Sequence, residues 1–372
     1  MSKNLSRTRM LRAAAAVCLS TLSGLLAVPA AVQAQAVAPA PLKVAFVYVS
    51  PVGQAGWTFQ HDQGRQAMEQ ALGSKVRTTV VEAVAEGADS ERVMRDLAAQ
   101  GHQLIFATSF GYLEPALRVA ADHPSVKIEH AGGYKTAANL NTYNARYYEA
   151  RYLAGMLAGY SSQSGVAGYV AGFPVPEVVQ GVNAFTLGMR AVNPKAEVKV
   201  VWLNAWFDPP RERDAALSLI AQGADVLTNH SGSPAVPQTA EEKGVKLVAY
   251  QSDMARFAPR AQLAAVTHHW GGYYTQVAQS VLAGRWAAKP VWGGMKDGLV
   301  RLTALSPTLP ATTVKALQER EQAIKAGRFH PFSGPLKDNQ GQLRLSQGVL
   351  PDPQIAQMDW LVEGVGGKLP GR

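Results

Sequence analysis

Short apolar runs rich in β-branched and aromatic residues alternate with amphipathic segments over the first part of the chain. The apolar runs predict buried strands at residues 44–49, 78–81, 104–108 and 126–130. Apolar residues at helical spacing between them predict helices over residues 62–72, 90–99 and 113–121. A strand–helix alternation of this kind indicates a parallel, doubly wound sheet.

The same alternation resumes after about residue 145. A long helix predicted over residues 147–160 carries small residues on one side, suited to close helix packing: Ala154, Gly155, Ala158 and Gly159. Further strands are predicted at residues 166–171, 198–203, 225–229 and 246–250, and helices at 178–192, 212–222 and 235–243. Because the pattern is used twice, the sequence predicts two α/β lobes of similar size.

The remainder of the chain does not form a third lobe. We expect a strand at 261–268 and a helix at 272–282 to return to the first lobe, and a strand at 299–302 and a helix at 311–326 to return to the second. The predicted units are residues 42–145 with 261–290 for lobe 1, 146–260 with 291–330 for lobe 2, and 331–372 as a closing segment that contains a hairpin. Several crossings between lobes imply a hinge with a cleft.

The first 36 residues have the organisation of a cleavable secretory signal peptide, with a basic region, an apolar stretch and small-residue cleavage patterns. The basic region contains Lys3, Arg7, Arg9 and Arg12. The single cysteine, Cys18, lies in this segment after Ala16-Val17, a context that disfavours a lipid anchor. We therefore expect a periplasmic mature protein without cysteine, which excludes disulfides.

Composition limits the class of protein further. The 372 residues are 47% hydrophobic, enough for two domains with cores of their own. The net charge is +9, or +5 without the four cations of the signal peptide, and lysine and arginine do not cluster. We therefore expect no nucleic-acid partner. We also expect a monomer. No later apolar stretch approaches the roughly 18 residues of a membrane-spanning helix.

Aromatic and polar residues gather in the loops that follow predicted strands. The stretch 43–64 has this form, with a strand, a loop broken by Pro51 and Gly53, Trp57, and then a helix. Each aromatic residue alone would more often be structural than functional, but together they offer flat faces to a planar heterocycle. The candidate ligand-binding residues are Trp57, Thr58, Ser109, Phe110, Tyr112, Asn144, Trp206, His230, Gln251, Asp253, His268, His269 and Trp270.

Catalytic signatures are missing from the sequence. It has no GxSxG elbow, no Walker A loop and no GxGxxG motif after a strand. His268 and His269 are adjacent on a predicted strand, so they point to opposite faces and are poorly suited to hold one metal ion. We therefore expect neither an enzyme nor a cofactor or metal. A secreted nucleoside hydrolase is the disfavoured alternative, because it would need a cluster of acidic residues.

Segments along the whole mature chain resemble the basic membrane protein (Bmp) family of ABC-transporter substrate-binding proteins, which includes purine nucleoside receptors. They are GWTFQHDQGR (56–65), SFGYLEPALRVAADHPSVKIEHAGGYK (109–135), NTYNARYYEARYLAG (141–155), GYVAGFPVPEVVQGVNAFTLGMRAVNP (168–194), WFDPPRERDAA (206–216), YQSDM (250–254) and HPFSGPLKDNQG (330–341). The resemblance implies a type I periplasmic binding-protein fold, with two doubly wound lobes joined by a hinge of three crossings. It also implies a membrane permease as partner.

The resemblance assigns roles to individual residues. Trp57 and Trp206 take the places of the family's two stacking phenylalanines, and Thr58 that of an asparagine. Gln251 falls near the aspartate that holds ribose hydroxyls in nucleoside-binding relatives. His268 or His269 falls near a ligand-contacting lysine.

Departures from the family pattern bear on the ligand. Gln54 stands where the family has an aspartate, and Gln251 replaces the ribose-binding carboxylate, although Asp253 is close. Both changes favour a bare nucleobase such as adenine, or another flat heterocycle. The GWTF variant is similar to family members that bind purine bases. A purine nucleoside receptor and a ligand-presenting subunit of a periplasmic sensor are the alternatives.

Overall fold

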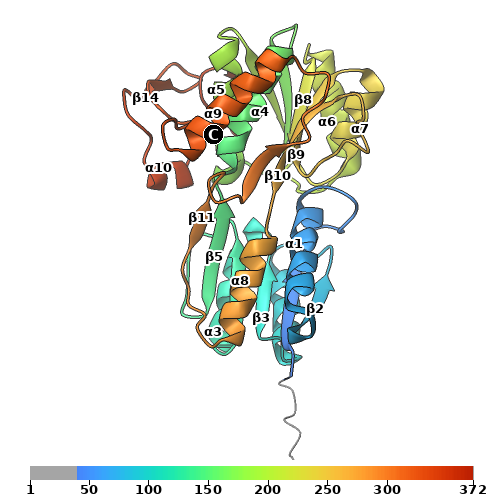
Figure 1. Ribbon diagram of the computed structural model, residues 1–372, viewed down its shortest axis with the longest axis vertical. Helices are drawn as coiled ribbons and strands as arrows, with labels where there is room; N and C mark the ends of the chain where they lie inside the picture. Colours follow the sequence, from blue (N-terminus) through green and yellow to red (C-terminus); the bar gives the residue numbers. More distant parts are fainter. Residues whose placement is uncertain (1–39, 372) are drawn as a thin grey trace, which may run out of the picture. The chain divides into compact units, whose positions relative to one another are not determined.

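The first lobe is built on a parallel sheet that contains four of the strands predicted for it. The computed structural model describes residues 40–371, so the predicted signal peptide with Cys18 lies outside the described residues. The strand order is β11 (Val291–Gly293), β5 (Leu140–Ala145), β4 (Lys127–Ala131), β3 (Leu104–Ala107), β1 (Leu42–Val47) and β2 (Val76–Val81). Its helices are α1 (Trp57–Leu72), α2 (Ala88–Ala99), α3 (Leu113–Asp122) and α8 (Gly271–Leu282). Helices α1 and α8 lie side by side (Figure 1).

The second lobe repeats this plan with a larger sheet. Its order is β12 (Val300–Thr303), β10 (Gln262–His268), β9 (Lys246–Gln251), β8 (Val226–His230), β6 (Val166–Ala171), β7 (Glu197–Trp202) and β15 (Val365–Gly366). Only β12 runs antiparallel to its neighbour among the paired strands described for this sheet. The lobe's helices are α4 (Tyr147–Ser161), α5 (Pro176–Val192), α6 (Pro209–Ala221), α7 (Ala235–Lys243) and α9 (Ala311–Lys325). The predicted α/β fold with two lobes is confirmed.

Strand pairing corrects two of the predicted lobe boundaries. Strand β10, which we expect in lobe 1, pairs in parallel with β9 and so belongs to the second sheet. Conversely, β11 pairs with β5 in the first sheet although its residues were expected in lobe 2. All seven residues of β10 are buried, and an apolar strand carries no local mark of the sheet it joins. The chain therefore passes between the lobes at residues 145–147, 268–271 and 293–300.

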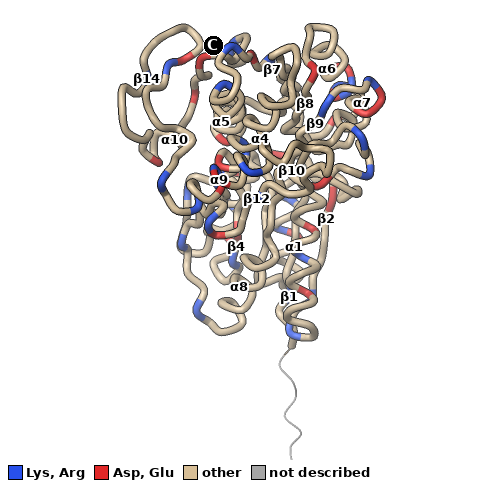
Figure 2. Tube along the Cα trace, turned by 45° about the horizontal axis from the view of Figure 1, so that its top comes forward, with Lys and Arg blue, Asp and Glu red and all other residues tan. Residues whose placement is uncertain are grey.

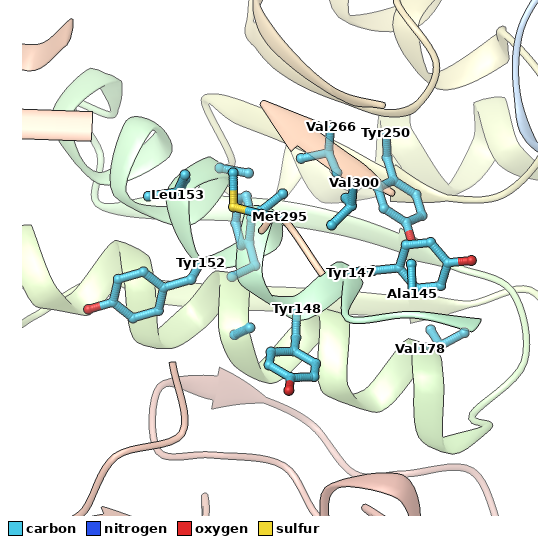
Figure 3. Packing of buried hydrophobic residues seen from close by; sticks show 14 of the residues in the cluster. Ala145, Tyr147, Tyr148, Tyr152, Leu153, Val178, Tyr250, Val266, Met295 and Val300 are labelled. Atoms are coloured by element: carbon cyan, nitrogen blue, oxygen red, sulfur yellow. The ribbon is translucent and has the colours of Figure 1, made fainter. Parts of the chain in front are cut away.

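Helices α4 and α5 form the closely packed centre of the second lobe. A Cβ at Gly155 of α4 would lie 1.9 Å from the carbonyl oxygen of Phe185 in α5, and one at Gly188 would lie 2.0 Å from that of Tyr152. The side of α4 that carries the predicted small residues therefore allows the backbones of α4 and α5 to lie in contact. The bulky α4 side chains point elsewhere, and Figure 3 shows Tyr147 directed toward Tyr250 of β9.

The predicted hairpin of the closing segment is formed by β13 (Leu336–Lys337) and β14 (Leu343–Leu345), which pair antiparallel. It is followed by α10 (Asp352–Ala356) and by β15 at the edge of the second sheet. Arg146, at the first crossing, donates to both carboxylate oxygens of Asp352 at 2.7 and 2.5 Å. The tail is therefore anchored to the hinge as well as to lobe 2.

Charged residues of both signs are intermixed over the two lobes, as on helix α7 (Figure 2). Within residues 40–371, no helix is both long enough and apolar enough to cross a membrane.

Candidate functional site

A cavity lies between the lobes, at the end where the parallel strands of both sheets terminate. It encloses about 520 Å³ of space not filled by atoms, including its part open to solvent. Lobe 1 lines it with Val49, Ser50, Trp57, Ser109, Phe110, Ala131 and Gly132. Lobe 2 lines it with Val175, Glu177, Trp206, His230, Gly232 and Gln251. Carboxyl ends of parallel strands are where open α/β sheets bind ligands, which makes this cavity the candidate site.

Two tryptophans, one from each lobe, line this cavity and are half-buried. Trp57 is the first residue of α1, and its indole Nε1 donates to the backbone oxygen of Thr108 at 2.7 Å. Trp206 follows β7, and its ring packs edge-on against Phe173 with ring centres 4.8 Å apart. Both rings are thus held by neighbours and border the cavity.

Contacts across the cavity join the two lobes. Trp206 Nε1 donates to Glu86 Oε1 of lobe 1 at 3.0 Å. The same oxygen accepts from Ser109 Oγ at 2.5 Å, which holds the carboxylate in place. On the other side, the amide of Gly56 donates to Ser252 Oγ of lobe 2 at 2.7 Å. The lobes are therefore in direct contact around the cavity.

Gly56 gives a test of this lobe contact. Its φ of +94° disfavours any side chain, and a Cβ would lie 2.3 Å from the backbone oxygen of Gly232 in the other lobe. We expect Gly56→Ala to weaken ligand binding at least about tenfold, roughly 1.4 kcal/mol, because the lobes could not approach fully. Isothermal titration calorimetry measures this change.

Gly53→Ala is the matched control for that substitution. Gly53 lies in the same loop with φ +58°, but the nearest atom to its added Cβ is 4.0 Å away and belongs to Pro51. The Gly53→Ala substitution therefore introduces backbone strain in the loop without a clash between the lobes. Equal losses of affinity in both variants would attribute the effect to the loop and contradict our explanation.

Among the described residues, the titratable side chains that line the cavity belong to lobe 2. Glu177, at the start of α5, has a side chain only 13% exposed, and its Oε1 lies 3.6 Å from His230 Nε2. Burial raises the pKa of Glu177 to about 7, against the opposing effect of a hydrogen bond from Asn144. Burial, with the nearby Arg151 charge, holds the pKa of His230 well below its usual value. At neutral pH the pair therefore combines an uncharged imidazole with a carboxyl that is partly protonated.

Gln251 reaches the cavity through an unusual backbone conformation. It ends β9 with φ +72°, in the left-handed region that non-glycine residues seldom adopt. Its Oε1 is buried and accepts no hydrogen bond within residues 40–371. A strained residue with an unused acceptor at a cavity is typical of a ligand-contacting position.

Two predicted site residues of lobe 1 do not line the cavity. The Thr58 hydroxyl lies 2.7 Å from that of Ser50, and Ser50 rather than Thr58 borders the cavity. Tyr112 is fully buried, and its hydroxyl donates to the backbone oxygen of Val84 at 2.6 Å. Thr58 therefore contacts a residue of the cavity wall, whereas Tyr112 belongs to a hydrophobic core of lobe 1.

Asn144 and Asp253 do not line the cavity either. Asn144 borders a neighbouring groove, and its Oδ1 accepts from the amide of Ala145. Asp253 Oδ1 accepts from Gln262 Nε2 at 2.7 Å and from a backbone amide. The carboxylate close to Gln251 in sequence is therefore occupied within its own lobe.

His268, His269 and Trp270 border a separate open groove at the hinge. His268 is fully buried and lies edge-on to the Trp57 ring, with centres 5.7 Å apart. Trp270 is stacked on His61 with ring centres 5.4 Å apart, while His269 Nε2 lies 2.9 Å from the Thr267 hydroxyl. Neither histidine lines the interlobe cavity. His268 instead packs against the ring of Trp57, which does line it.

Sequence reasoning missed Glu177 and Glu86, although it found Trp57, Ser109, Phe110, Trp206, His230 and Gln251 on the cavity wall. A signal for Glu177 existed in Pro176, because proline favours the first helical position and so predicts a helix start there. Glu86 lies in an irregular loop, and no local pattern connects it with Trp206. Within the described residues, no group of three or more His, Cys, Asp or Glu side chains is arranged to hold a metal ion.

Comparison with known sequences agrees with this architecture. Residues 42–329 match the model of the Bmp family, described as ABC transporter substrate-binding protein PnrA-like. The chain belongs to this family. Substrate-binding proteins of ABC transporters act outside the cytoplasm, in keeping with the predicted signal peptide.

Two similar proteins cover most of the chain. A purine-binding protein of Brucella abortus is 49% identical over 330 residues, which are 88% of this chain and 94% of that protein. A Haloferax volcanii protein, described as a proposed ABC transporter glucose-binding protein, is 38% identical over 88% of this chain and 81% of its own length.

Solved structures show the same fold. An ABC transporter solute-binding protein of Aeropyrum pernix superposes with a TM-score of 0.67 at 19% identity, covering 80% of this chain and 93% of that one. One from Conexibacter woesei gives a TM-score of 0.63 at 19% identity, covering 78% and 98%. The fold is thus the two-lobed type I fold of periplasmic binding proteins.

Proposed function

We propose that this chain captures a purine nucleobase, of the adenine type, between its lobes in the periplasm and presents it to the permease of an ABC importer. The ligand binds and leaves chemically unchanged. Closing the lobes about the hinge buries it, and the closed form docks on the permease. A cytoplasmic ATPase coupled to the permease supplies the energy for transport.

The observation that carries this proposal is the pair Trp57 and Trp206, contributed by opposite lobes to one cavity. Aromatic faces bind planar heterocycles by stacking, with about 1–3 kcal/mol per stacked base. A few polar groups are available to contact the edge of the base: Ser50, Ser109, Glu177, His230 and Gln251. The similarity to a purine-binding protein supports the same ligand class.

The polar groups favour a bare base over a nucleoside or a sugar. A ribose diol is best held by a carboxylate, but Gln251 takes that place and Asp253 is bonded to Gln262. Glucose, suggested by the name of the second relative, would need a partner for each hydroxyl. Among the described residues that line the cavity, Glu177 is the sole carboxyl group.

Isothermal titration calorimetry with adenine, adenosine, guanosine and glucose tests the proposal. We expect adenine to bind at least about tenfold more tightly than either nucleoside, a difference of roughly 1.4 kcal/mol, and glucose not to bind. Tighter binding of a nucleoside or of glucose would refute the nucleobase assignment. Native mass spectrometry of the freshly purified protein adds an independent readout, because a ligand retained from the host is identified by its mass.

A further inference from the structure

Glu177 lies where the lobes meet. It is carried by α5 of lobe 2, and Gly132 of lobe 1 faces it, with the position of an added Cβ 3.4 Å from Glu177 Oε2. Because Gly132 has no side chain, a ligand in the cavity can approach the carboxyl group from lobe 1. His230 Nε2, at 3.6 Å from Oε1, is too far for a hydrogen bond. Asn144 donates one hydrogen bond to the carboxyl group, which has further hydrogen-bonding positions for a ligand.

No cation balances this carboxyl group. Within residues 40–371, no lysine or arginine lies at ion-pair distance from Glu177, and its ion-pair contact there is with His230. Burial without a counter-charge favours the protonated acid, and the pKa of Glu177 is accordingly raised to about 7. The group therefore changes its charge within the physiological pH range.

The neighbouring groups do not change charge in that range. Burial lowers the pKa of His230 on β8 and raises the pKa of the surrounding phenols, so all of these groups stay neutral near pH 7. The phenols belong to Tyr147 of α4, Tyr169 of β6 and Tyr250 of β9. His130 on β4 of lobe 1 has a pKa lowered to about 3 by burial, and the Arg151 guanidinium of α4 stacks 4.3 Å from the Tyr250 ring centre.

We propose that Glu177 reads the hydrogen-bonding edge of the bound base, and that its protonation state decides which base is accepted. A protonated carboxyl group offers one donor beside one acceptor. This matches adenine, whose amino group donates next to a ring nitrogen that accepts. An ionised carboxylate offers acceptors only, which matches the adjacent ring N–H and amino donors of guanine. This inference rests on the proposed function and adds a specificity-determining residue to it.

The experiment titrates the purified full-length mature protein with adenine and with guanine, followed by quenching of tryptophan fluorescence. For the wild type we expect adenine affinity to fall about tenfold between about pH 6 and about pH 8, because a group of pKa near 7 loses its proton over that interval. Guanine affinity should rise by about the same factor, since it requires the ionised form.

Glu177→Gln separates this role from a structural one. An amide always offers a donor and an acceptor, so the variant should bind adenine with equal affinity at both pH values. Its guanine affinity should fall at least about tenfold below that of the wild type at about pH 8, because the amide cannot accept two donors. Glu319→Gln, on the exposed surface of α9, is the matched control and should keep the wild-type pH profile.

The outcomes distinguish this inference from the function on which it rests. If adenine binds the wild type with the same affinity at both pH values, Glu177 does not select the base although the receptor assignment stands. Glu177 is likewise not the selecting group if Glu177→Gln keeps the wild-type pH slope. If neither base binds at either pH, the proposed function itself fails.

Discussion

Replacing Trp206 by alanine is expected to weaken binding of the proposed nucleobase ligand by roughly 30- to 150-fold, about 2–3 kcal/mol. The substitution removes one of the two indoles that line the cavity. It also removes the hydrogen bond from Nε1 to Glu86, which joins the lobes when they are closed. Stacking and closure are therefore lost together. Isothermal titration calorimetry with adenine gives the affinity directly.

Two further variants separate these contributions. Trp206→Phe keeps an aromatic face but loses the indole N–H, so its deficit measures the contact with Glu86 and should be about tenfold or less. Phe207→Ala changes the adjacent aromatic residue, which is 38% exposed and does not line the cavity. It should bind within about threefold of the wild type. An affinity for adenine that is unchanged in Trp206→Ala would remove the support for stacking between the lobes.

Replacing Gly155 by alanine is expected to destabilise the protein by about 2–3 kcal/mol, even though alanine is the better helix former by about 1 kcal/mol. The added methyl group would lie 1.9 Å from the Phe185 carbonyl oxygen of α5. Both clashing groups are held by helical backbone, so relief requires α4 and α5 to separate and to lose packing along their length. Thermal and urea unfolding, followed by circular dichroism, measure the loss.

Gly272→Ala is the control for that measurement. Gly272 lies in helix α8, and an added Cβ there meets no atom within 4 Å. Its effect should stay within about 1 kcal/mol and be neutral or stabilising, as expected from helix propensity alone. If Gly155→Ala were equally well tolerated, the close approach of α4 and α5 would not be a source of stability.

Much of the fold follows from local patterns. Apolar runs bounded by turns indicated the strands, helical spacing indicated the helices, and the small residues of α4 indicated close packing before its partner was known. Strand β5 escaped prediction because its sequence, LNTYNA, is largely polar although five of its six residues are buried. Strand β10 was assigned to the wrong lobe because sheet membership depends on pairing between distant residues.

The candidate site was predicted less completely than the fold. The structure places six of the predicted aromatic and polar residues around one cavity, because the ends of parallel strands share an edge. The directions in which these side chains point could not be predicted from the sequence. Thr58 follows Trp57 directly yet bonds to Ser50, and Asp253 is two residues from Gln251 yet bonds to Gln262. Such choices depend on the backbone conformation of each loop, as the φ of +72° at Gln251 illustrates.

By itself, the sequence determined the repeated order of strands and helices, from which two lobes follow. It also determined that aromatic residues come directly after several strands. Both features follow from the spacing of apolar, aromatic and polar residues along the chain, which involves only a few neighbouring positions at a time. Only the tertiary structure decided which side chains share the cavity, including Glu177, and which contacts join the lobes, such as Gly56 to Ser252 across 196 positions. Contacts of that range arise from the pairing of sheets and the approach of lobes, and no local pattern encodes them.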